Sequence, residues 1–183
     1  MRLFHFSDNP AIEAFAPRPV RVPSPRAPDR EWLNGPLVWA IDDWHQPMFL
    51  FPRDCPRILL WPVVDTTPED LATWFGGSSA RIVAHIEAAW LDRLRQTPIH
   101  RYEFQSEGFE DLDDAGMWVS RETVTPIGME TLHDLPTVLR AQDVELRVME
   151  RLGPLQNVWL SSLHASGSRL RNAQDWPGPP KTP

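Results

Sequence analysis

The sequence predicts an α+β domain with a compact mixed sheet and short flanking helices. Short apolar runs at residues 37–41 and 57–61 have the length and composition of buried strands. Brief segments with apolar residues at helical spacing alternate irregularly with such runs, and no internal repeat occurs. The chain's 20 prolines interrupt any long helix. We therefore expect a single globular domain over residues 1–172 with many loops.

Strands are expected where apolar residues run together or alternate, at residues 3–6, 37–41, 57–61, 81–87, 99–105, 117–119, 123–125 and 144–149. Helices are expected after Asp8 or Asn9, from Asp42 or Asp43 to Leu50, and at residues 67–75, 90–96, 132–141 and 155–163. The clearest start is Thr67-Pro68, a cap followed by proline. The tail at 173–183 has too little apolar surface to offset its ordering entropy, so we expect disorder there.

Residues 16–36 form a Pro- and Arg-rich segment that the pattern assigns to a loop within the domain. Too little chain precedes this segment to fold alone, so it is not a linker between domains. At about twenty residues it exceeds the usual connection length, which is typical of a functional or mobile loop.

Composition excludes several classes of protein. No run approaches the roughly 18 apolar residues of a membrane span, so we expect no membrane partner. The net charge of −7 disfavours general nucleic-acid binding, which needs a basic surface. A lone cysteine, Cys55, excludes an internal disulfide and, with no export signal at the N-terminus, suggests a cytoplasmic location.

Two biases in composition suggest binding surfaces. The nine tryptophans must be buried or used for stacking, and a Trp-rich surface would suit a protein partner. Lys181 is the only lysine, so arginine supplies almost all of the positive charge. Its planar fork suits phosphate and carboxylate groups. Genomic codon bias is the alternative explanation for the arginines.

The turn at residues 53–57, in which Pro52 and Pro56 bracket residues 53–55, holds two arginines and a carboxylate within five residues. One interpretation is an internal ion pair with Asp54 that stiffens the turn. The other is a phosphate clamp made by Arg53 and Arg57. Cys55 lacks an evident partner base, which favours a buried structural thiol over a nucleophile.

Other polar residues give weaker signals. His5 and Ser7 share one face of the first strand and could present donors and acceptors to one ligand, although a hydrogen-bonded core histidine is the alternative. Glu87 stands where a strand meets a helix, where the helix dipole favours a carboxylate. The only tyrosine, Tyr102, is expected in the core. No H-x-x-x-H or C-x-x-C spacing occurs, so no metal site is expected.

The segments LFHFS, VWAI, FPRDCPR and RYEF, at residues 3–7, 38–41, 51–57 and 101–104, resemble an uncharacterised bacterial protein family that carries no known function. The aromatic-His-x-Ser pattern at residues 4–7 and the strand at 37–40 also resemble ADP-ribosyltransferase-like domains. Residues 117–126 are similar to the late strand pair of the RNA phosphotransferase branch of that superfamily. The implied fold is the split-sheet ADP-ribosyltransferase-like fold.

This second resemblance implies roles for particular residues. His5 would hydrogen-bond the adenosine ribose of a dinucleotide, with Ser7 beside it. An indole, that of Trp39 or of Trp44, would stack on a ring of the ligand. The pyrophosphate would be held by Arg53 or Arg57.

The same resemblance requires a late catalytic glutamate that orients the ribose hydroxyl as the glycosidic bond breaks. Glu122 is nearest the matching strands, although it follows Arg121 and lacks the usual Glu-x-Glu context. A domain without this carboxylate would either only bind nucleotide or use arginines instead. If the protein is an enzyme, the resemblance implies an ADP-ribosyl- or RNA phosphotransferase-like transferase.

We therefore expect a nucleotide- or NAD-binding domain whose ligand, a dinucleotide or phosphorylated small molecule, lies between the sheet halves. No resident cofactor is identified, and NAD is a candidate substrate. The alternative is a non-catalytic interaction or structural protein that uses a Trp-rich surface. The first would converge its site residues on one concave pocket, whereas the second would disperse them around an exposed apolar patch.

Overall fold

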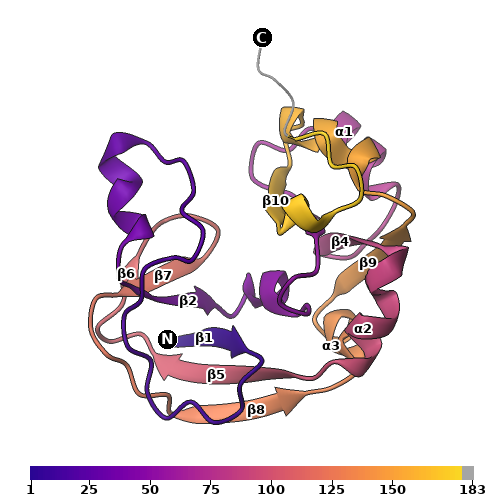
Figure 1. The fold of residues 1–183 in the computed structure, drawn as a ribbon. Helices are drawn as coiled ribbons and strands as arrows, with labels where there is room; N and C mark the ends of the chain where they lie inside the picture. The colour runs from indigo at the N-terminus through magenta and orange to yellow at the C-terminus, as the bar shows by residue number, and fades with distance from the viewer. Residues whose placement is uncertain (179–183) are drawn as a thin grey trace. The chain divides into compact units, whose positions relative to one another are not determined.

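The computed structural model describes residues 1–178, and residues 179–183 lie outside the described part. It confirms the α+β class, with two sheets and several short helices. The chain divides into two compact units that interleave in the sequence (Figure 1). Unit 1 comprises residues 1–49 and 99–131, and unit 2 comprises residues 50–98 and 132–183. One domain over residues 1–172, and the likeness to the split-sheet fold, stay predictions.

Unit 1 is built on a six-stranded sheet with the order β6-β7-β2-β1-β5-β8. The pairings of β1 with β2 and β5, and of β7 with β2 and β6, are antiparallel. The strands are β1 (Arg2–Ser7), β2 (Val38–Asp42), β5 (Ile99–Gln105), β6 (Glu110–Asp111), β7 (Met117–Ser120) and β8 (Gly128–Leu132), with 3-10 helices η1 (Pro28–Asn34) and η2 (Gln46–Phe49).

The two faces of this sheet carry separate apolar clusters because side chains alternate along each strand. One face buries Leu3, Phe15, Val38, Ala40, Tyr102 and Phe104. The other buries Leu33, Leu37, Leu112 and Val119, against which Trp32 and Trp39 pack. Tyr102 is 1% exposed, which confirms its assignment to the core.

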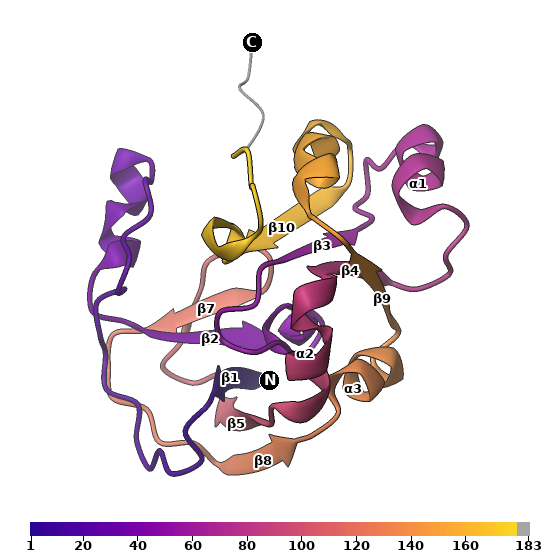
Figure 2. The same ribbon diagram turned by 45° about the vertical axis from the view of Figure 1, so that its right-hand side comes forward.

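Unit 2 contains a four-stranded sheet with the order β10-β3-β4-β9 (Figure 2). Strand β4 pairs in parallel with β9, and the other two pairings are antiparallel. The strands are β3 (Arg57–Trp61), β4 (Ile82–Glu87), β9 (Val144–Met149) and β10 (His164–Ser168). The helices are α1 (Pro68–Phe75), η3 (Ala88–Trp90), α2 (Leu91–Gln96), α3 (Leu135–Ala141), η4 (Gly153–Leu160) and η5 (Leu170–Asn172).

Strands β3 and β4 are buried along their whole length, which explains their continuous apolar character. One face of this sheet forms a cluster with α1 and η4 through Ile58, Leu60, Phe75, Val83, Leu152, Leu155, Val158 and Leu163. Helix α1 begins where predicted, because the Thr67 hydroxyl accepts from Asp70 N at 3.2 Å. It ends at Gly76, whose φ of 58° is the left-handed conformation that glycine favours.

Several local predictions were wrong. No helix follows Pro10, because the Tyr102 hydroxyl binds Asn9 O and Ile12 N, and Phe15 pairs with Val124 in an isolated bridge. That bridge also replaces the strand expected at 123–125. The helices expected at 42–50 and 155–163 do form, but as the 3-10 helices η2 and η4. Strands β6, β8 and β10, and helix η1 in the segment at 16–36, had no apolar pattern to predict them.

The tail expected to be disordered from residue 173 is described as far as residue 178. Ala173 and Trp176 pack against the apolar cluster of unit 2. Gln174 N donates to the Glu87 carboxylate at 2.9 Å. These contacts give residues 173–176 an apolar and hydrogen-bonded anchor. The remainder of the predicted tail, residues 179–183, lies outside the described residues.

Candidate functional site

The residues predicted to bind a dinucleotide are divided between the two units. Unit 1 holds His5, Ser7 and Trp39, together with the predicted catalytic residue Glu122, and unit 2 holds Arg53 and Arg57. The contacts of each residue within its own unit determine which ligand groups it can bind.

In unit 1, His5 and Ser7 lie on the face of β1 that carries the Tyr102 cluster. His5 is opposite Tyr102 in the register, its ring centroid is 4.7 Å from that of Phe15, and its Nδ1 is 2.8 Å from Trp39 O. The Ser7 hydroxyl is buried and accepts from Asn9 N at 3.1 Å. The Trp39 indole packs against the cluster on the other face. His5 and Trp39 are therefore joined through a main-chain oxygen and present their rings to opposite faces of the sheet.

Glu122 lies in an exposed connection after β7. Its N–H donates to the hydroxyl of buried Ser120 at 3.2 Å, which shapes the main chain of this turn. Within residues 1–178, no hydrogen bond joins the Glu122 carboxylate to His5 or Ser7. The catalytic role of Glu122 stays a prediction.

A carboxylate–imidazole pair that the sequence did not reveal stands at the end of β2. Asp42 accepts from His45 N at 2.7 Å and lies 2.9 Å from His45 Nδ1 through both oxygens. Burial raises the pKa of Asp42, but the hydrogen bonds from His45 outweigh it and hold that pKa below its ordinary value. Gly116 has φ of 69° and lies against both side chains, where no Cβ would fit. This arrangement orients the imidazole.

In unit 2, the turn before β3 is held closed by the segment that follows β10. Cys55 N donates to Pro52 O at 2.9 Å, as the flanking prolines predict. Arg169 Nε donates to Arg53 O at 3.1 Å, and Asn172 Nδ2 donates to Asp54 O at 2.8 Å. The main-chain oxygens at the tip of the turn are therefore occupied by two side chains from the far end of the chain.

Arg57 is the central side chain of this region. It is only 5% exposed, it donates to Cys55 O at 3.1 Å, and its guanidinium lies 5.2 Å from the Phe51 ring centroid. Burial, opposed by Cys55 and reinforced by Arg169, lowers the pKa of Arg57 to about 10, so it stays charged at neutral pH. Asp54 is exposed, and its carboxylate forms no ion pair within residues 1–178. An ion pair that stiffens the turn is thus not formed.

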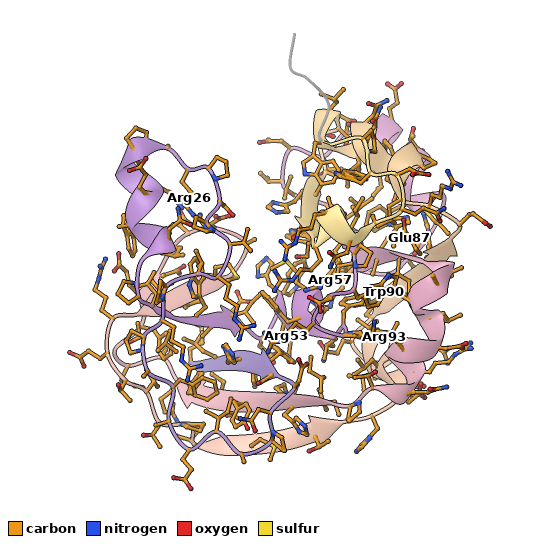
Figure 3. All side chains as sticks on the ribbon, viewed as in Figure 1. Arg26, Arg53, Arg57, Glu87, Trp90 and Arg93 are labelled. Atoms are coloured by element: carbon orange, nitrogen blue, oxygen red, sulfur yellow. The ribbon has the colours of Figure 1, made fainter. Side chains whose placement is uncertain are left out.

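The Cys55 thiol lies beside Arg57 and is fully buried. Burial raises the pKa of Cys55 to about 12, although Arg57 and Arg93 both lower it. The thiol is therefore protonated at neutral pH, which disfavours a nucleophilic role. Arg57 and Arg93 both lower the pKa of this thiol through their positive charge, and Arg169 lowers the pKa of Arg57 in the same way. Arg169 also binds the main chain of Arg53, so four arginines lie around the turn. We call Arg53, Arg57, Arg93 and Arg169 the arginine cluster; Figure 3 labels the first three.

Glu87 is the buried carboxylate of this region and is 4% exposed. It stands at the N-terminus of η3, as the sequence predicted, but its side chain forms no capping hydrogen bond. Its oxygens accept from Gln174 N at 2.9 and 3.2 Å and from Leu152 N at 3.4 Å. On the next turn, the Arg93 guanidinium lies 4.6 Å from the Trp90 ring centroid (Figure 3). Arg93 is exposed and Trp90 is half-buried.

Sequence reasoning identified Arg53 and Arg57 but missed the partners that complete the cluster. Arg169 has a left-handed backbone, with φ of 56°, and no sequence pattern predicts that conformation. Trp90 and Arg93 are three residues apart on a helical segment, a spacing that predicts side-chain contact. That spacing was the one signal that could have drawn attention to them.

Two further findings bear on the predicted classes. No group of three or more His, Cys, Asp or Glu side chains in residues 1–178 is arranged to hold a metal ion. Nor does any helix in that part of the chain have the length and apolar character needed to cross a bilayer. The tryptophans are mostly engaged in packing; Trp44 is 41% exposed, whereas Trp74, Trp159 and Trp176 pack on the cluster of unit 2.

A family model described as "Family of unknown function (DUF6886)" matches residues 4–173. The match covers nearly the whole chain, so the protein belongs to this family, in agreement with the resemblance to an uncharacterised family. No curated protein and no solved structure matches the chain.

Proposed function

We propose that this member of the family binds a phosphate-bearing ligand, a nucleotide or dinucleotide such as NAD, at the arginine cluster of unit 2. The observation that supports the proposal is the gathering of positive charge around a buried arginine. Arg57 remains cationic in a desolvated position, and a second arginine, Arg169, lies close enough to lower its pKa. Like charges repel, and a bound anion relieves that repulsion.

The positions of the neighbouring carboxylates also favour binding of an anionic ligand. Asp54 points its carboxylate into solvent, and Glu87 is hydrogen-bonded to main-chain N–H groups of Leu152 and Gln174. A dianionic phosphate matches several guanidinium groups better than one carboxylate does, because each planar fork binds two oxygens.

The Trp90–Arg93 pair would supply the contact for a ring. An indole under a guanidinium 4.6 Å away already forms a stacked layer at the edge of the cluster. A nucleobase could extend that layer while its phosphates reach Arg57 and Arg169. This is why a nucleotide fits the cluster better than inorganic phosphate alone.

The test is a thermal-shift series with inorganic phosphate, AMP, ADP-ribose and NAD at matched ionic strength. A ligand at about one hundred times its dissociation constant adds about 2.7 kcal/mol of stability. We expect nucleotides to stabilise the protein more than phosphate does. Absence of a shift with every compound at millimolar concentration would refute the proposal.

Helix α2 offers a matched pair of control variants. Arg93 stacks on Trp90, whereas Arg95 is 57% exposed and faces Asp92 at 3.7 Å. Arg93→Gln should weaken nucleotide binding about tenfold, the cost of one charge-assisted contact, and Arg95→Gln should leave it unchanged. Equal losses in both variants would indicate a general charge effect and contradict a site.

ADP-ribosyl or RNA phosphotransferase-like transfer is a narrower proposal that rests on the resemblance alone. In that reading Glu122 is the catalytic carboxylate, and His5, Ser7 and Trp39 contact the dinucleotide. Release of nicotinamide from NAD, measured for the wild type and for Glu122→Gln, tests it. No release by the wild type would refute transfer from NAD while leaving nucleotide binding to the thermal-shift series.

A further inference from the structure

A pair of side chains in unit 1 has unsatisfied hydrogen-bond donors. Arg26 Nε and Trp39 Nε1 are both buried from solvent, and neither has a hydrogen-bond partner among the described residues. The Arg26 guanidinium lies 5.9 Å from the Trp39 ring centroid. A buried donor without a partner costs on the order of 1–3 kcal/mol, so two adjacent ones call for an explanation.

The position of Arg26 is fixed by the fold of the segment at residues 16–36. The segment is closed at its base by a two-way bridge between Arg18 and Leu37, with both N···O distances at 3.2 Å. Higher up, the Asn34 amide binds both main-chain groups of Ser24, at 3.0 and 3.1 Å. Figure 3 shows Arg26 inside the resulting bend. The segment is thus a built structure that places one arginine over β2.

The surroundings of Trp39 are apolar. Its indole packs against the cluster formed by Leu33, Leu37, Leu112 and Val119. No oxygen of these side chains exists to accept from the indole N–H. The two unsatisfied donors therefore lie beside an apolar surface and one positive charge. A negatively charged acceptor oxygen would satisfy both donors.

A neighbouring pair in the same unit shows what is missing here. The Arg121 guanidinium lies 4.3 Å from the Trp32 ring centroid, and Arg121 also pairs with Glu110 at 3.6 Å. Arg26 Nε, by contrast, has no hydrogen-bond partner within residues 1–178. In unit 1, the arginine over Trp32 thus has an anion supplied by the chain, whereas the arginine over Trp39 has an unsatisfied donor.

We propose that Arg26 and Trp39 form an oxyanion-binding site in which one ligand oxygen, from a phosphate or carboxylate group, accepts from Trp39 Nε1 and Arg26 Nε. The site gives the Pro- and Arg-rich segment a function, because folding of that segment is what carries Arg26 to Trp39.

The test is an NMR titration of the side-chain N–H signals of Arg26 Nε and Trp39 Nε1, with Trp39→Phe identifying the indole signal. Inorganic phosphate and acetate are the probes, and chloride at equal ionic strength is the control. We expect a saturable downfield shift of both signals with one or both probes. The two probes distinguish a phosphate ligand from a carboxylate ligand.

Two variants test whether the response depends on Arg26. Arg26→Gln should weaken the response about ten- to hundredfold, whereas Arg121→Gln, which removes the neighbouring Arg-on-Trp pair, should leave it unchanged. Signals that respond to neither probe, that respond equally to chloride, or that show only exchange with a trapped water would overturn the proposal. If Trp39→Phe does not fold, the Arg26 Nε signal alone gives the same answer.

Discussion

His85 should make the protein lose stability as the solution becomes mildly acidic. It lies on β4, is 3% exposed, and bonds the main chain of Ile58 while its Nδ1 has no partner among the described residues. Burial, assisted by the charge of Arg147, lowers the pKa of His85 to about 4 from its ordinary 6.5. Glu145 opposes this shift, but its carboxylate is bound to Arg147 at 2.6 Å.

The direction and magnitude of this change in stability follow from proton linkage. Between about pH 6.5 and about pH 4 the unfolded chain binds a proton at this histidine and the native protein does not, so stability falls as the pH falls. His85 contributes its full stability above about pH 6.5. A shift of about 2.5 pKa units corresponds to about 3 kcal/mol lost over that interval.

The assay is urea unfolding at several pH values across that interval, on the wild type and on His85→Gln, which keeps a side-chain donor and does not titrate. We expect the wild type to lose about 3 kcal/mol more than the variant between about pH 6.5 and about pH 4. The lowered pKa of Glu145 is present in both proteins, and the stability it contributes is lost only as the pH falls through about 4.5 and below. Parallel pH profiles for the two proteins would refute the reasoning.

Two other predictions follow from single residues. Gly116→Ala should destabilise the protein by about 2 kcal/mol or more in a denaturation experiment, because the residue is left-handed and its new Cβ would clash with Asp42 and His45; unchanged stability would contradict this. Cys55 should react with iodoacetamide about a thousandfold more slowly in the native protein than in urea, since burial raises its pKa to about 12; rapid native labelling would contradict it.

Elements with a strong local signal were predictable from the sequence. The apolar runs of β3 and β4 and the capped start of α1 are set by burial and by Thr67-Pro68, which act over a few residues. Strand β10, with sequence His-Ala-Ser-Gly-Ser, has no such signal. It is a strand because it pairs with β3 over five residues, and pairing partners distant in sequence are invisible to a local pattern.

For the candidate site, the sequence predicts the types of residue but not their burial or their neighbours. The Arg-rich turn at residues 53–57 made Arg57 a candidate, but its burial could not be anticipated because charged side chains are seldom buried. Its neighbour Arg169 is 112 positions away in the sequence and arrives through the pairing of β10 with β3, which sets Ser168 opposite Arg57. The clustering of these arginines therefore depends on the tertiary structure and not on the local sequence.

The alternation of a β-strand explains why His5 and Trp39 were grouped by sequence and are separated in space. Phe4 is opposite Ile41 in the register, and side chains alternate along each strand, so His5 and Trp39 fall on opposite faces of the sheet. The Trp39 indole packs against the cluster that contains Leu37 and Val119, whereas the His5 ring lies against Phe15 of the Tyr102 cluster. A shift of one residue would have united the two rings, and the sequence contains no turn between β1 and β2 short enough to specify that register. The Trp39 indole therefore turns toward Arg26, where its unsatisfied N–H makes the more specific case for a ligand.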